Sequence, residues 1–123
     1  MIIGIGLDLC QISRMEENIQ NAHFMMRYFS AEERAYVAER GKMAASSLAA
    51  MFAAKEAFVK AMGTGFQTTK LDEIAVLHDA FGAPYYDLRG DMKQNAEQKH
   101  ITHTFLSITH EAGLAAAMCV LEG

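Results

Sequence analysis

The chain begins with a strict alternation of two kinds of residue. Apolar side chains occupy every second position from 3 to 9, and Gly4, Gly6 and Asp8 lie between them. A period of two with β-branched residues predicts a strand over 2–9. Two glycines on one face indicate that another element approaches the backbone closely there. Asp8 stands at the end of that bare face.

Helical patterns follow. Helices are expected at 11–27 (one or two short ones), 30–40, 44–62 and 88–98. Ser30 and Glu33 have the spacing of a capping box at the start of the second of these segments. The helix over 44–62 is the clearest, because apolar residues recur at helical spacing, alanines favour helix, and Gly63 ends it.

Short extended segments fill the second half of the chain. Strands are expected at 74–77, 85–86, 103–109 and 113–121. A turn at Gly82–Pro84 precedes the second, and a tight connection at Glu111–Gly113 joins the last two. No repeat or linker interrupts the pattern. The sequence therefore predicts one α+β domain over 1–123, with helices packed on a small, largely antiparallel sheet.

The composition of the chain disfavours several classes of protein. The 123 residues suit one domain, and 11 basic against 15 acidic residues give a net charge of -4, which disfavours a general nucleic-acid binder. Cys10 and Cys119 form no metal-binding or disulfide pattern and suit a reducing compartment. The longest apolar run, 112–121, is far short of the roughly 20 residues of a membrane span. We expect a soluble, cytoplasmic protein that binds neither nucleic acid nor membrane.

Glu56 and Lys60 are the first candidate site residues. They lie four apart on the predicted long helix and project from the same side. A surface ion pair is the simplest interpretation. However, that helix is otherwise nearly devoid of charge, and the Gly63–Gly65 segment can present backbone N–H groups to an anion. The same glycines also suit an ordinary helix C-cap.

Asp8 adds a second carboxylate from a different element. By itself it could simply cap the following helix. Together with Glu56 it matches the one or two carboxylates that hold magnesium while water and substrate phosphates complete the octahedron. A nearby lysine would neutralise charge on a leaving phosphate, so the three residues suit a diphosphate substrate. His110 closes the predicted strand 103–109, where either a ligand contact or a structural hydrogen bond is possible.

Three motifs together resemble one family. They are G-I-G-L-D-L followed by Arg14, then F-A-A-K-E-A-F-V-K-A at 52–61 continuing to Gly63-Thr64-Gly65, and L-S-I-T-H at 106–110. In this order and in a chain of this length they resemble the holo-[acyl-carrier-protein] synthases, the small bacterial 4′-phosphopantetheinyl transferases. The resemblance covers essentially the whole chain.

The resemblance implies a reaction and a set of site residues. The reaction is transfer of phosphopantetheine from coenzyme A to a serine of apo acyl carrier protein, for fatty acid biosynthesis, with release of adenosine 3′,5′-bisphosphate. The assembly implied is a homotrimer with active sites at subunit interfaces. By position, the resemblance implies that Asp8 and Glu56 bind Mg²⁺ and that these two residues and Lys60 are catalytic. It implies that coenzyme A is bound by Lys60, Gly63, Thr64, Gly65, Pro84 and His110. It implies that the carrier protein is bound by Arg14, Phe24 and Arg27.

Some positions depart from the family pattern. Met51 stands where the family commonly has an arginine that holds a coenzyme A phosphate, so this contact is lost or supplied elsewhere, with Lys42 as a candidate. Glu16 and Glu17 oppose an acidic carrier. The apolar segment 105–121 independently favours an oligomer. Two alternatives stay open: a non-catalytic oligomeric module that binds coenzyme A or a nucleotide, and a hydrolase that uses water on a diphosphate.

Overall fold

A computed structural model describes residues 1–63 and 70–123 of the chain. Its elements, in chain order, are β1 (Ile2–Gln11), α1 (Ile12–Asn18), α2 (Ala22–Tyr28), α3 (Ala31–Ala38), a 3₁₀ turn (Gly41–Met43), α4 (Ala44–Met62), a second 3₁₀ turn (Leu71–Glu73), β2 (Ile74–His78), β3 (Pro84–Leu88), α5 (Gly90–Gln98), β4 (His103–Glu111) and β5 (Leu114–Glu122). Every predicted helix and strand is present, and the α+β class is confirmed.

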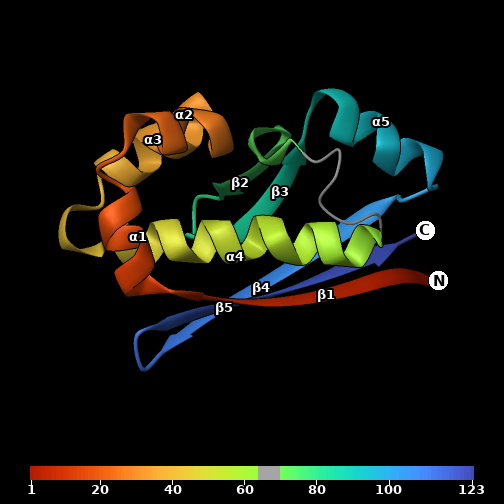
Figure 1. The fold of residues 1–123 in the computed structure, drawn as a ribbon. Coiled ribbons are helices and arrows are strands. Elements are labelled where there is room, and N and C mark those ends of the chain that lie inside the picture. The colour runs from red at the N-terminus through yellow and green to blue at the C-terminus, as the bar shows by residue number, and fades with distance from the viewer. Residues whose placement is uncertain (64–69) are drawn as a thin grey trace.

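The strands form two sheets where the sequence predicted one. The strands β1, β5 and β4 make an antiparallel sheet in that order, and β2 pairs antiparallel with β3 alone. The helix α4 runs between the two sheets (Figure 1). The β2–β3 hairpin packs on α4 through Tyr86, whose hydroxyl donates to the carbonyl of Ala54 at 2.6 Å. The hairpin is thus held by the helix. The single-sheet prediction was wrong, because among the described strands neither β2 nor β3 pairs with a strand of the larger sheet.

Two glycines let α4 lie directly on the backbone of β1. A Cβ atom at Gly4 would stand 2.0 Å from the carbonyl oxygen of Ala61, and one at Gly6 would stand 1.8 Å from that of Ala57. Real Cβ atoms do not come so close, so any larger residue would force the strand and helix apart. The predicted close approach at these glycines is confirmed. It brings the C-terminal half of α4 over the face of β1 that carries Asp8.

A buried ion pair ties the middle of α4 to α3 and β2. The Nζ of Lys55 donates to Oε1 of Glu33 at 2.7 Å and to the carbonyls of Leu71 and Ile74, both at 2.8 Å. The other carboxylate oxygen of Glu33 accepts from the N–H of Val76 at 3.0 Å. Burial lowers the pKa of Lys55 to about 8, against the opposing effect of the Glu33 charge. The helix turn that carries Glu56 is therefore fixed in place.

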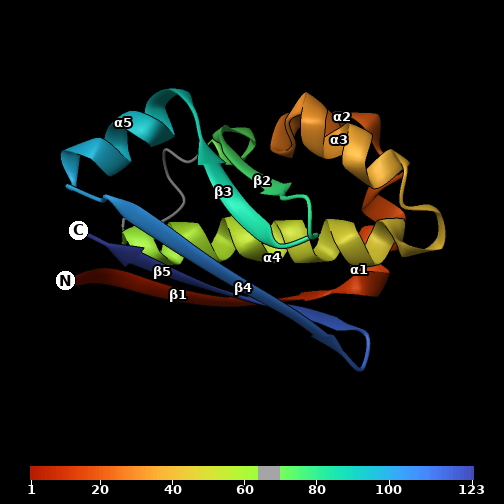
Figure 2. The same cartoon turned by 180° about the vertical axis from the view of Figure 1, so that it is seen from behind.

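The three-stranded sheet has one covered face and one open apolar face. Figure 2 shows α4 along one face of the sheet and no described element on the other. Ile5, Leu7 and Leu9 on the open face are 68%, 63% and 62% exposed, and Met118 of β5 is 49% exposed. Sequence analysis placed the apolar surface on segment 105–121, but β1 contributes most of it. Of the described helices, none combines the length and apolarity that a membrane crossing requires.

Candidate functional site

Asp8 and Lys60 meet at the junction of β1 and α4. Because Asp8 shares its face of β1 with Gly4 and Gly6, its side chain reaches the helix. The Nζ of Lys60 donates to Oδ1 of Asp8 at 2.9 Å and to the carbonyl of Leu7 at 3.0 Å. The Asp8 side chain is 18% exposed and that of Lys60 is 48% exposed. Two of the three predicted catalytic residues are therefore in direct contact at a solvent-accessible edge.

Glu56 completes the group from one turn earlier on α4. Its pKa is raised, first by burial and then by the negative charge of Asp8, while the charges of Lys60 and Arg14 act in the opposite direction. Asp8 and Glu56 are both partly buried, and their negative charges repel each other. A divalent cation bound between them would relieve that repulsion. The residues present thus suit the magnesium ion that the sequence implied.

The donor set at this junction is small. Over residues 1–63 and 70–123, no group of three or more His, Cys, Asp or Glu side chains could hold a metal ion. A cation here would take two carboxylate oxygens, and water or substrate would supply its remaining ligands. That is the usual arrangement for magnesium in proteins that act on phosphates, whereas a structural zinc site needs four protein ligands.

Gly63 caps the C-terminal end of α4. It adopts a left-handed conformation with φ of 72°, and its N–H donates to the carbonyl of Lys60 at 3.1 Å. The ordinary C-cap interpretation of this glycine is therefore confirmed. Lys99, the residue that follows α5, donates to the carbonyl of Met62 and adds a cation at the same helix end. The other two members of the predicted glycine-rich loop, Thr64 and Gly65, lie outside the described residues.

Pro84 and His110 line a common hollow between β3 and β4. This pocket has a volume of about 230 Å³, and its other lining residues include Arg40, Ser47 and His78. A neighbouring hollow of about 500 Å³ shares Arg40 and His78 with it. The structure therefore brings together two of the predicted coenzyme A residues and adds a cation to them.

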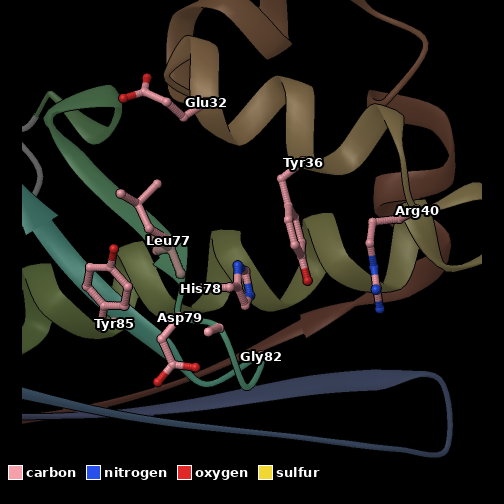
Figure 3. Close-up of a pocket in the computed structure, with 10 residues that line it drawn as sticks. Glu32, Tyr36, Arg40, Leu77, His78, Asp79, Gly82 and Tyr85 are labelled. Carbon is pink, nitrogen blue, oxygen red and sulfur yellow. The ribbon is translucent and has the colours of Figure 1, made fainter.

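A three-membered stack forms one wall of these hollows. In Figure 3, Tyr36 lies between His78 and Arg40. The Tyr36 and His78 rings are 4.1 Å apart and nearly parallel, and the Arg40 guanidinium is 5.4 Å from the Tyr36 ring centroid. Arg40 also donates to the hydroxyl of Ser47 at 3.1 Å. Burial, and then the charge of Arg40, lower the pKa of His78.

Sequence analysis did not single out this stack. Tyr36 lies in the last turn of α3, and Arg40 follows two residues after the helix ends. His78 belongs to β2, and no sequence spacing connects it to them. Lys42, the expected substitute for the arginine missing at Met51, does not line either hollow among the described residues; Arg40 does.

The three predicted carrier-binding residues lie on one aromatic cluster beside the acidic pair. The guanidinium of Arg14 is 5.3 Å from the ring centroid of Phe52, and that of Arg27 is 5.3 Å from the ring centroid of Tyr28. The cluster also contains Phe24, which is 5.0 Å from Tyr28 and half-buried. The two arginines are exposed, but Phe24 packs against the neighbouring aromatic rings of the protein.

Comparison with known proteins identifies the family. The family model described as the 4′-phosphopantetheinyl transferase superfamily matches residues 4–119. The chain belongs to this superfamily. Within it, the holo-[acyl-carrier-protein] synthase of Treponema denticola is 42% identical over 123 residues, which cover all of both chains.

Solved structures within the superfamily agree. The holo-[acyl-carrier-protein] synthase of Neisseria meningitidis has a TM-score of 0.90 and 32% identity, with all of both chains covered. That of Helicobacter pylori, determined in complex with coenzyme A, has a TM-score of 0.83 and 29% identity over 96% of this chain and 99% of that one. The resemblance that the three sequence motifs carried is therefore confirmed.

Proposed function

We propose that the chain transfers the 4′-phosphopantetheine arm of coenzyme A to a serine of apo acyl carrier protein, a step that serves fatty acid biosynthesis. The observation that carries the proposal is the Asp8–Glu56 pair beside Lys60 in a member of this superfamily. The serine oxygen forms a bond to the phosphorus that bears the pantetheine arm, and the serine hydroxyl releases its proton to the surrounding water. The bridging P–O bond breaks, and adenosine 3′,5′-bisphosphate leaves with the bridging oxygen.

In this proposal Asp8 and Glu56 hold Mg²⁺. When bound there, the ion would polarise the diphosphate and neutralise part of its charge. Lys60 stabilises the negative charge that develops on the departing bisphosphate. Its position supports this role, since the side chain is 48% exposed and shares the site with both carboxylates. A placed cation of this kind contributes about 10²–10³ in rate.

Coenzyme A binding is assigned to residues on both sides of the site. Lys60, Gly63, Thr64 and Gly65 would meet the diphosphate, and Pro84 and His110 would line the site further along. The hollow shared by the last two residues supports their assignment. Met51 is buried in the core, so its side chain cannot replace the family's arginine. Arg40, which borders the same hollow, is the cation available to a phosphate there.

The proposed assembly is a homotrimer with interfacial active sites. Its support is the open apolar face of the sheet, which holds Ile5, Leu7 and Leu9 at more than 60% exposure. Apolar patches of that kind are typical of protein interfaces. The two free cysteines, Cys10 and Cys119, suit the reducing cytoplasm, where we expect the enzyme to act.

The proposed carrier surface comprises Arg14, Phe24 and Arg27. Both arginines are exposed beside the aromatic cluster, which would present positive charge to an acidic carrier protein. Since Phe24 is half-buried, its neighbour Met26, which is 66% exposed, is the more accessible apolar contact. A local basic patch is needed because the whole chain carries a net charge of -4.

Mass spectrometry of a carrier protein tests the reaction class. The protein is mixed with coenzyme A, Mg²⁺ and an apo acyl carrier protein, and a mass gain on the carrier equal to the phosphopantetheine arm is expected. Cleavage of coenzyme A without that gain would instead favour the hydrolase. Binding of coenzyme A without cleavage would favour the non-catalytic module.

A further inference from the structure

The ammonium group of Lys60 is hydrogen-bonded to β1. Of its three hydrogen-bond donors, one reaches Oδ1 of Asp8 at 2.9 Å and another reaches the carbonyl of Leu7 at 3.0 Å. Lys60 therefore engages one of the two oxygens of Asp8, and its positive charge lies beside the carboxylate that a divalent cation would share. It also stands on the same side of α4 as Glu56, four residues away, so its positive charge acts on Glu56 as well as on the Asp8 carboxylate that it contacts.

We propose that Lys60 is an exchangeable counter-ion of the Asp8–Glu56 pair, which keeps the free protein's affinity for divalent cations low until a diphosphate draws the ammonium away. The inference rests on the proposed function, because it takes these two carboxylates as the metal ligands. It adds an order of assembly: the cation and the diphosphate substrate bind with mutual reinforcement, and the cation alone binds weakly.

Electrostatics gives the reason for weak binding. An ammonium and a divalent cation that share one carboxylate would stand within about 5 Å of each other, where like charges repel strongly even at a protein surface. Ligating carboxylates are commonly hydrogen-bonded at their other oxygen, so the ammonium does not block the cation sterically, and the competition between the two is electrostatic. The cation therefore binds Asp8 weakly while the ammonium stays beside it.

The diphosphate provides the new partner for that ammonium. The Lys60 side chain is 48% exposed, so its head group is free to turn from the strand toward a ligand at the mouth of the site. A doubly charged diphosphate is a stronger partner for an ammonium than one carboxylate. Since binding couplings are reciprocal, a diphosphate that removes Lys60 from Asp8 raises cation affinity, and the cation raises diphosphate affinity to the same degree.

Binding of Mn²⁺, followed by electron paramagnetic resonance without turnover, tests the inference. In the free protein, Lys60→Met and Lys60→Gln should each bind Mn²⁺ about tenfold or more tightly than the wild type, because the competing charge is gone. Lys60→Arg keeps that charge and should stay close to wild type. The remote variant Lys70→Met, at an exposed lysine paired with Asp91, is the matched control and should change nothing.

Addition of coenzyme A distinguishes the counter-ion role of Lys60 from the metal site itself. Adding it should tighten Mn²⁺ binding more in the wild type than in Lys60→Met, since only the wild type has an ammonium to remove. Equal or weaker Mn²⁺ binding by both neutral variants would overturn the counter-ion role while leaving the metal site intact. Mn²⁺ binding that persists unchanged in Asp8→Asn would instead contradict the metal site itself, and with it the proposed catalytic centre.

Discussion

A methyl group at Gly6 would collide with the backbone of α4. Its Cβ would stand 1.8 Å from the carbonyl oxygen of Ala57 and 2.9 Å from the amide nitrogen of Ala61, whereas ordinary contact begins at 3.4 Å. No rotamer change relieves the clash, because the opposing atoms belong to the main chain. In Gly6→Ala the strand and the helix must therefore separate by roughly 1.5 Å.

The separation has a cost in stability and a larger cost in function. Overpacking of this kind costs about 1–3 kcal/mol, and each kcal/mol lowers the melting temperature of a domain this size by about 3–6 °C. The 2.9 Å contact between Lys60 and Asp8 crosses the same junction. Since misplacement of reacting groups by about 1 Å can reduce a rate 10²-fold, transfer by the folded variant should decrease by a similar factor.

Thermal unfolding and the transfer rate per folded molecule measure the two effects. Gly41→Ala is the control: its φ of +57° imposes backbone strain of about 1–2 kcal/mol, but an added Cβ would meet nothing within 4 Å. That variant should lose stability and keep the wild-type rate. A Gly6→Ala protein with both the wild-type melting temperature and the wild-type rate would refute the claim that backbone contact between β1 and α4 builds the site.

Three further variants test other parts of the molecule. Leu7→Asp places a charge on the open apolar face and should dissociate the proposed homotrimer in analytical ultracentrifugation while the circular dichroism spectrum is kept; a persisting trimer would locate the interface elsewhere. Glu33→Gln preserves a capping side chain but leaves Lys55 buried without a counter-charge. Urea denaturation should therefore show that the free energy of unfolding decreases by about 3–5 kcal/mol. A decrease below about 1 kcal/mol would instead indicate that Lys55 is neutral in the folded protein. Arg27→Glu should raise the KM for the carrier and leave that for coenzyme A nearly unchanged, with weaker carrier binding as salt rises; unaffected carrier kinetics in Arg27→Glu and Arg14→Glu alike would exclude this docking surface.

The sequence predicted what local periodicity determines. The bounds of α4 agree with the helical pattern and its terminal glycine, and the bare face of β1 at Gly4 and Gly6 correctly indicated a close neighbour. The capping box of Ser30 and Glu33 is also present. What the pattern could not reveal is that the same Glu33 carboxylate pairs with Lys55, because 22 residues separate them and neither spacing nor composition connects the two.

The candidate site was likewise predicted from the sequence only in part. Asp8 and Glu56 were paired in sequence analysis because carboxylates beside a lysine suit a phosphate-bound cation, and the structure brings them together across β1 and α4. The stack of Tyr36 and His78 escaped detection, since it depends on how the β2–β3 hairpin lies against the end of α3. Such long-range packing has no signature in a single sequence.

The cation dependence of carrier modification tests the central claim most directly. Intact-mass spectrometry would follow an apo acyl carrier protein incubated with coenzyme A and either the wild type or Asp8→Asn, each with Mg²⁺ or with excess chelator. If the junction of β1 and α4 is the transferase centre, the phosphopantetheine mass gain should occur only with the wild type and Mg²⁺. Full modification in excess chelator, or by Asp8→Asn at the wild-type rate, would contradict it.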